Sequence, residues 1–270
     1  MRANHVKEHL HAGLPSVGTW LSIPSPFVAE YMAQIGFDWL VVDTEHNPIS
    51  IETVAAMFMG MANSGAAPMV RIPWNSSENI KRVLDAGAWG IVVPMVNSRE
   101  EAELAVASAK YPPEGIRSVG GGRHSISFQD DGQPGYQDRA NDNVVVVVQA
   151  EHIKAVEQAD EILSVPGIDA CFIGPNDLMA SKGMRPQLES DDPRVVEAIE
   201  HIRVTCRKYG VAPGIHTYNQ KMANRRIQEG FQFIALASEL RFMLAASKAE
   251  LAQVETGRPM AAVGAAGPKY

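Results

Sequence analysis

The sequence predicts a single α/β domain folded as a TIM barrel, a closed ring of eight parallel strands with helices outside it. Short apolar runs recur eight times along the 270 residues, and amphipathic stretches with helical periodicity separate most of them. The runs are rich in Val, Ile and Leu, as in strands that are covered on both faces of a parallel sheet. A barrel of this kind routinely takes a chain of this length as one domain. An open, doubly wound sheet stays as the alternative.

Each expected strand is an apolar run that stops at polar residues, glycine or proline. The strands are residues 17–22, 37–43, 67–72, 90–96, 143–151, 169–174, 212–217 and 233–237. Helices are expected around them, several ending in glycine as helix C-termini often do, at residues 25–36, 49–65, 76–87, 98–111, 153–165, 193–210, 220–230 and 240–254. We expect residues 1–255 to form the domain and residues 256–270 to be a disordered tail.

Composition narrows the class of protein. With 46% hydrophobic residues, 20% charged residues and a net charge of -7, the chain is typical of a soluble globular protein with no attraction to nucleic acid or anionic membranes. Cys171 and Cys206 lie in a strand and a helix pattern, which favours buried, reduced thiols. The N-terminus lacks an apolar signal segment and no run is long enough to span a membrane, so a cytoplasmic enzyme is expected.

Polar or aromatic residues stand where the expected strands end, and active sites of this fold collect at the carboxyl ends of the strands. Chance placement in polar loops explains one or two such endings, but not a charged residue after each of several apolar runs. The residues concerned are Trp20, Asp43 to His46, Arg71, Gln149, Glu151, Gly174 to Asp177 and His216.

Glu151 and Asp177 close adjacent expected strands, so a barrel would bring the two carboxylates together. With Gln149 nearby they make an oxygen-rich site suited to a hard divalent cation such as Mg²⁺ or Mn²⁺. The structural alternative is a helix N-cap or a surface charge, above all for Asp177.

His46 is the residue of this group that exchanges protons near neutral pH without a large pKa shift, which makes it the candidate general base. The charge of Arg71 suits an enolate or a carboxylate, and an ion pair with Asp43 or Glu45 is its structural alternative. Asp43 or Thr44 could also serve simply to turn the chain. The glycines of SVGGGRHS, residues 118–125, follow no strand, so we interpret this segment as a flexible active-site loop, with no assigned role for His124.

Several segments resemble the HpcH/HpaI family of class II pyruvate aldolases over about residues 17–250. They are GFDWLVVDTEH, VRIPWN, IKRVLDAGAWGIVVPMV, YPPEGIRSVG, VVVQAE and GIDACFIGPNDL, in the family's order. The resemblance implies a TIM barrel that uses Mg²⁺, Mn²⁺ or Co²⁺ and the enolate of pyruvate. It also implies a hexamer in which neighbouring subunits complete the sites. The expected reaction is reversible cleavage of a 4-hydroxy-2-oxo acid to pyruvate and an aldehyde.

The resemblance also implies residue roles. Glu151 and Asp177 match the metal ligands, with Gln149 beside them. His46 matches the proton-transfer histidine, and Asp85 matches an acid that pairs with it. Further matches are Arg71 to the arginine that holds the pyruvate oxygens, Asp43 to an acid near the histidine, Trp20 to the pocket wall, and Gly174, Pro175 and Asn176 to a turn whose N–H groups meet the pyruvate carboxylate.

Three positions depart from the family pattern: His152, Asn176 and His216. The last is expected to face the incoming aldehyde and to favour polar aldehydes, unless it turns away to bond Tyr218 or the backbone. Two other functions stay open, an acyl-CoA lyase of the citrate-lyase-beta or malyl-CoA type and a non-catalytic ligand-binding barrel. No basic segment suited to a CoA phosphate is present, and no lysine stands at a strand end to form a Schiff base.

Overall fold

The computed structural model describes residues 3–128, 135–187 and 189–255. Eight parallel strands form a closed barrel in chain order, because β1 pairs with both β2 and β8. The TIM barrel is confirmed and the open doubly wound sheet is wrong. The strands are β1 (Ser16–Leu21), β2 (Trp39–Asp43), β3 (Ala67–Arg71), β4 (Gly90–Val93), β5 (Val145–Ala150), β6 (Ala170–Ile173), β7 (Ala212–Thr217) and β8 (Phe233–Ser238).

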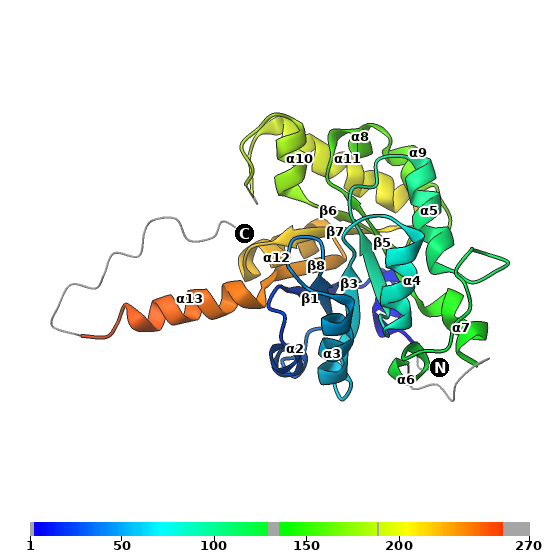
Figure 1. Ribbon diagram of the computed structural model, residues 1–270. Helices are drawn as coiled ribbons and strands as arrows, with labels where there is room; N and C mark the ends of the chain where they lie inside the picture. Colours follow the sequence, from blue (N-terminus) through cyan, green and yellow to red (C-terminus); the bar gives the residue numbers. More distant parts are fainter. Residues whose placement is uncertain (1–2, 129–134, 188, 256–270) are drawn as a thin grey trace.

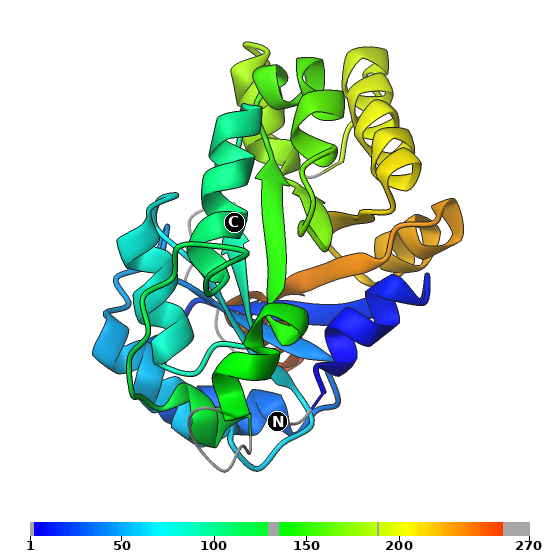
Figure 2. The same ribbon diagram turned by 90° about the vertical axis from the view of Figure 1, so that its right-hand side faces the viewer.

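Helices lie outside the ring of strands (Figures 1 and 2). Their caps follow the sequence: Ser25, Ser50, Ser76 and Ser98 each accept a hydrogen bond from the first turn that follows. The helices are α1 (His5–His11), α2 (Pro26–Ala33), α3 (Ile51–Met61), α4 (Ser77–Asp85), α5 (Arg99–Ala109), α6 (His124–Ser127), α7 (Gly135–Asn143), α8 (Ile153–Glu157), α9 (Ala159–Leu163), α10 (Pro175–Ser181), α11 (Pro193–Tyr209), α12 (Gln220–Glu229) and α13 (Glu239–Leu251). Sequence periodicity predicts none of α1, α6, α7 and α10, and it joins α8 and α9 into one helix.

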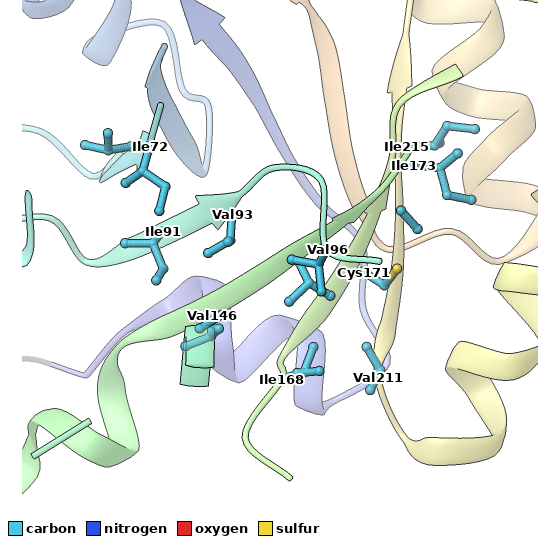
Figure 3. Packing of buried hydrophobic residues seen from close by; sticks show 14 of the residues in the cluster. Ile72, Ile91, Val93, Val96, Val146, Ile168, Cys171, Ile173, Val211 and Ile215 are labelled. Atoms are coloured by element: carbon cyan, nitrogen blue, oxygen red, sulfur yellow. The ribbon is translucent and has the colours of Figure 1, made fainter. Parts of the chain in front are cut away.

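Alternate strand positions supply two apolar layers. Inside the barrel the Trp39 and Phe233 rings stack with centroids 4.2 Å apart. A Cβ atom at Gly18 would lie 2.0 Å from the Trp39 ring, so only glycine fits there. The other layer lies between strands and helices, where Figure 3 shows side chains such as Ile91 and Ile215. Each strand is therefore covered on both faces, as its continuous apolar run predicts.

The two ends of the barrel differ in their role. At the amino ends of the strands, Asn4 ahead of α1 donates from Nδ2 to the Trp89 carbonyl at 2.9 Å, and His5 contacts the Asp38 carbonyl at 2.9 Å. At the carboxyl ends, which we call the rim, the strands deliver the polar side chains singled out from the sequence. The amino end is thus tied together by structural hydrogen bonds, and the rim carries the candidate chemistry.

The last described helix, α13, projects away from the barrel in Figure 1. Glu239, its first residue, is its buried member.

The expected tail 256–270 lies outside the described residues. Cys171 and Cys206 are free, buried thiols that contact each other, and burial raises the pKa of Cys206. No described helix combines the length and the apolar character needed to cross a membrane.

Candidate active site

Asp43 and Arg71 are the last residues of β2 and β3 and stand opposite each other in the parallel register. Arg71 donates from Nε to Asp43 Oδ1 and from Nη2 to Oδ2, both at 2.8 Å, which forms a two-pronged ion pair. Asp43 also accepts from Asn47 Nδ2 at 2.6 Å. Burial alone would raise the pKa of Asp43, but the Arg71 hydrogen bonds and charge outweigh it and hold the pKa below its usual value. The ion pair with Asp43 that was the structural alternative for Arg71 is therefore present.

Glu45 joins this pair, and sequence reasoning predicted no role in proton transfer for it. Its Oε2 lies 3.2 Å from Arg71 Nη1 yet is buried without a hydrogen bond. Burial raises the pKa of Glu45 to about 7; the Arg71 charge opposes the rise, and the charges of Asp43 and Asp177 add to it. Glu45 can therefore bind or release a proton near neutral pH.

His46, the candidate general base, lies next to Glu45 at the rim. Its Nε2 lies 3.6 Å from Glu45 Oε2, and 59% of its side chain is exposed. Within one chain Glu45 therefore lies beside His46, and Asp43 is near enough for the His46 charge to act on it. An exposed imidazole next to a carboxylate can pass protons between a ligand at the rim and solvent.

Asp85, the acid expected to pair with His46, lies elsewhere in the chain's own fold. It ends α4 just before β4 begins, which places it at the amino ends of the strands. There it accepts from Arg117 Nη2 at 2.7 Å and lies 3.8 Å from His124 Nδ1. Gly120 and Gly122 of the 118–125 segment lie beside it, and His124 is fully buried. One chain does not bring Asp85 to His46, so their pairing stays a prediction that requires a second subunit.

Glu151 follows β5 and is held by two hydrogen bonds. Its Oε1 accepts from the Met95 backbone N–H at 2.9 Å, and its Oε2 accepts from Gln149 Nε2 at 2.6 Å. Burial raises the pKa of Glu151 to about 7; the Met95 bond opposes the rise, and the charges of Glu45 and Asp177 add to it. A Cβ atom at Gly174 would lie 2.7 Å from Glu151 Oε2, so glycine is required for this close approach.

Asp177 stands in the first turn of α10, which follows β6. Gly174 is the N-cap and Pro175 the first helical residue, so the alternative that Asp177 caps this helix is wrong. Asp177 is exposed and Asn176 half-buried. The charge of Asp177 acts on both Glu45 and Glu151. Asp177 therefore lies close enough to Glu45 and Glu151 for their charges to interact, and its exposure also agrees with the alternative of a surface charge.

The donor set can be tested for its fit to a divalent cation. Among the described residues, no group of three or more His, Cys, Asp and Glu side chains is arranged to hold a metal ion. Glu151 and Asp177 are two anionic oxygen donors, and Gln149 Oε1 is a buried oxygen without a hydrogen bond. Two carboxylates that repel each other beside an unused amide oxygen suit a hard cation whose other positions go to water and substrate. The residues present fit such an ion.

Trp20 on β1 and His216 on β7 lie beside each other at the rim. The Arg71 guanidinium lies 4.5 Å from the Trp20 ring centroid, and Trp20 Nε1 donates to His216 Nδ1 at 2.9 Å. The alternative that His216 turns to Tyr218 or the backbone is therefore wrong. Burial, together with the charges of Arg71 and Arg241, lowers the pKa of His216 to about 4.

Comparison with known proteins gives the family. The model of the HpcH/HpaI aldolase/citrate lyase family matches residues 16–246. The chain belongs to this family. It is 39% identical over 248 residues to a 4-hydroxy-2-oxo-heptane-1,7-dioate aldolase of Shigella sonnei, covering 91% of this chain and 93% of that protein. It is 36% identical to a hydroxypyruvate/pyruvate aldolase of Rhizorhabdus wittichii, covering 92% and 98%.

A solved structure of an HpcH/HpaI family protein from Burkholderia cenocepacia is similar with a TM-score of 0.87 and 31% identity, covering 93% of this chain and 99% of that one. The resemblance drawn from the sequence motifs is thus confirmed.

Within this HpcH/HpaI family member, sequence reasoning missed the proton exchange open to Glu45 and the contact made by Met95. Glu45 was visible as an acid at a strand end, whereas Met95 acts through its backbone N–H, which no side-chain motif reveals.

Proposed function

We propose that the protein is a metal-dependent aldolase that reversibly cleaves 4-hydroxy-2-oxo acids to pyruvate and an aldehyde. The observation that carries the proposal is the meeting of Glu151, Asp177 and Gln149 with Arg71 and Glu45 at one rim. Curated relatives that are 36–39% identical over more than nine-tenths of this chain are named aldolases. Pyruvate and the aldehyde are the small-molecule substrates.

Glu151, Asp177 and Gln149 would hold a divalent cation, Mg²⁺, Mn²⁺ or Co²⁺. Such an ion supplies Lewis acidity, which makes the C3 protons of pyruvate more acidic. Arg71 binds the pyruvate oxygens with the N–H groups that its ion pair with Asp43 leaves free. The backbone N–H groups after Gly174 orient the pyruvate carboxylate, and Trp20 forms a wall of the pocket.

Side chains of the protein carry out the proton transfer. His46 accepts the C3 proton of pyruvate, and the exposed imidazole passes it to Glu45 or to solvent. The C3 carbon then attacks the aldehyde carbonyl, and the same groups return a proton to the new hydroxyl oxygen. Asp43 keeps Arg71 oriented throughout. In the cleavage direction each step is reversed.

The test is metal dependence with matched variants. Glu151→Gln and Asp177→Asn each remove one anionic oxygen at nearly constant volume, so both metal affinity, measured by calorimetry, and aldol cleavage should fall by about a hundredfold. Glu161→Gln, an exposed acid on α9, is the control and should change neither. Full activity after exhaustive chelation, or a covalent adduct trapped with borohydride and pyruvate, would overturn the assignment.

A homo-oligomer, and specifically a hexamer, is also proposed. Phe27 and Tyr31 on α2, and Ile35 just after this helix, are exposed apolar side chains, at 72%, 73% and 64%. The projecting helix α13 exposes Met243 at 50%. Packing of these faces against other copies would bury apolar surface, and a second subunit would also supply Asp85 to His46.

We place the enzyme in the cytoplasm, in keeping with its free thiols.

A further inference from the structure

The loop between β4 and α5 contains a strained residue beside Glu151, a candidate metal ligand. Met95 has a φ of 53°, a left-handed conformation that is unfavourable for a residue with a side chain. In this conformation its backbone N–H donates to Glu151 Oε1 at 2.9 Å. Strained backbone persists only where the surrounding structure enforces it, and it is concentrated at functional sites. Contacts around Met95 must therefore hold its backbone in this conformation.

Asn97 makes the side-chain contact that closes this loop. Its Nδ2 donates to the Met95 carbonyl at 2.9 Å, and its backbone N–H donates to Glu101 Oε2 at 2.6 Å, in the first turn of α5. Between the two, the Val96 side chain is buried in the outer apolar layer (Figure 3). The Val96 N–H donates to the Gln149 carbonyl at 3.3 Å. The loop is thus fixed both to α5 and to β5.

Glu151 depends on this loop for the orientation of its carboxylate. Only 3% of Glu151 is exposed, so water cannot readily replace the Met95 N–H at Oε1. Gln149 Nε2 donates to the other oxygen, Oε2, at 2.6 Å. Hydrogen bonds to both oxygens define the plane of the carboxylate, and each oxygen keeps a lone pair for a cation. A shift of the Met95 N–H would release this plane at one side.

We propose that Asn97 is a positioning residue for the divalent cation, because it holds Met95 in the left-handed conformation that orients Glu151. The proposal rests on the proposed metal-dependent function and adds to it a residue that touches neither the cation nor the substrate. Partners that orient a metal ligand typically change metal affinity by about ten- to a hundredfold. Asn97 acts through the backbone of Met95, so we expect an effect of about tenfold, at the lower end of this range.

The experiment measures Mn²⁺ binding to the metal-free enzyme by calorimetry, without substrate. Asn97→Leu keeps nearly the same side-chain shape and removes the amide donor, so the Kd for Mn²⁺ should rise about tenfold. Met95→Gly in the Asn97→Leu background should recover most of this affinity, because glycine adopts a positive φ without support from Asn97. A residue that merely stabilised the fold would not be rescued in this way. If Asn97→Leu does not fold, Asn97→Ala makes the same test.

Asn141→Leu is the matched control. Asn141 Nδ2 also donates to a backbone carbonyl, that of Tyr111 at 3.0 Å, but it lies on α7, which leads into the amino end of β5, whereas Glu151 follows the carboxyl end. The control should lower stability to urea and leave Mn²⁺ affinity unchanged.

Three results would overturn the role of Asn97: unchanged Mn²⁺ affinity in Asn97→Leu, an equal loss in Asn141→Leu, or no recovery on adding Met95→Gly. The proposed function fails separately, if the intact enzyme binds Mn²⁺ but does not exchange pyruvate C3 protons with deuterated water. In that case the Mn²⁺ affinities of the variants still decide whether Asn97 positions Glu151.

Discussion

Replacing Asp43 with Asn should destabilise the folded protein by about 2–3 kcal/mol although the two side chains have nearly the same shape. The change removes the charge that faces Arg71 across the β2 and β3 register. Asp43 is 4% exposed and Arg71 keeps 13% of its side chain exposed, so water replaces the lost partner poorly. The remaining guanidinium would be left partly buried and under-compensated.

The magnitude follows from the contacts. Breaking a buried ion pair by removing one partner costs about 3–5 kcal/mol. Here Glu45 Oε2 remains 3.2 Å from Arg71 Nη1 and retains part of the attraction, and the partial exposure of Arg71 screens another part. These two effects reduce the expected cost to about 2–3 kcal/mol.

A double-mutant cycle measures this directly. Urea unfolding of Asp43→Asn, Arg71→Gln and the double variant should give a coupling energy of about 2 kcal/mol. The ion pair of Asp192 with Arg194 has the same two-pronged geometry, at 3.0 and 2.8 Å, but its side chains are 27% and 64% exposed, so its coupling should be far smaller. Equal coupling for the two pairs would refute the reasoning. Because the pKa of Asp43 is lowered on folding, its contribution should be present at neutral pH and vanish on strong acidification.

Three further predictions concern single residues and assembly. His46→Ala should slow exchange of pyruvate C3 protons with deuterated water by about a hundredfold, whereas His201→Ala, at an exposed position of α11, should not; equal rates would remove His46 from proton transfer. The lowered pKa of His216, about 4 against about 6.5 in the unfolded chain, means that the folded state binds fewer protons between these values. Stability to urea should therefore fall by about 2 kcal/mol from pH 7 to pH 5, and His216→Leu should lose that part. Light scattering should give the mass of a hexamer, and a monomer at micromolar concentration would contradict the proposed assembly.

The barrel could be predicted because a strand covered on both faces must be apolar along its whole length. The same logic placed Asp43, Arg71 and Glu151 together, since the carboxyl ends of parallel strands share one edge. Contacts between strands distant in sequence were not predictable. Trp20 and His216 are 196 residues apart, and no periodicity says that an indole N–H meets an imidazole. The role of Met95 was not predictable for another reason. Its φ of 53° and the hydrogen bond from its backbone N–H do not depend on its side chain, so no side-chain motif indicates them.

Asp85 shows where topology constrains a family resemblance. A residue that ends a helix just before the next strand must lie at the amino end of the barrel, whatever its match to a motif. Its contacts with Arg117 and His124 satisfy it there. A role for Asp85 beside His46 therefore implies that the amino end of one barrel approaches the rim of another. The sequence identifies Asp85 as a candidate acid. The fold of one chain shows that Asp85 could reach His46 only in an assembly of subunits.

The charges at the rim explain why these residues suit a divalent cation. Asp43 is balanced by Arg71, which leaves Glu45, Glu151 and Asp177 to repel one another across strands β2, β5 and β6. Burial, with a smaller contribution from this repulsion, raises the pKa of Glu45 and Glu151 to about 7, so that without a further cation part of the negative charge is relieved by protons. Glu151 and Asp177 would hold a divalent cation, whose charge would relieve the repulsion in place of those protons. Cation binding should therefore become tighter as the pH rises through neutrality, and it should leave Glu45 free to exchange protons with His46.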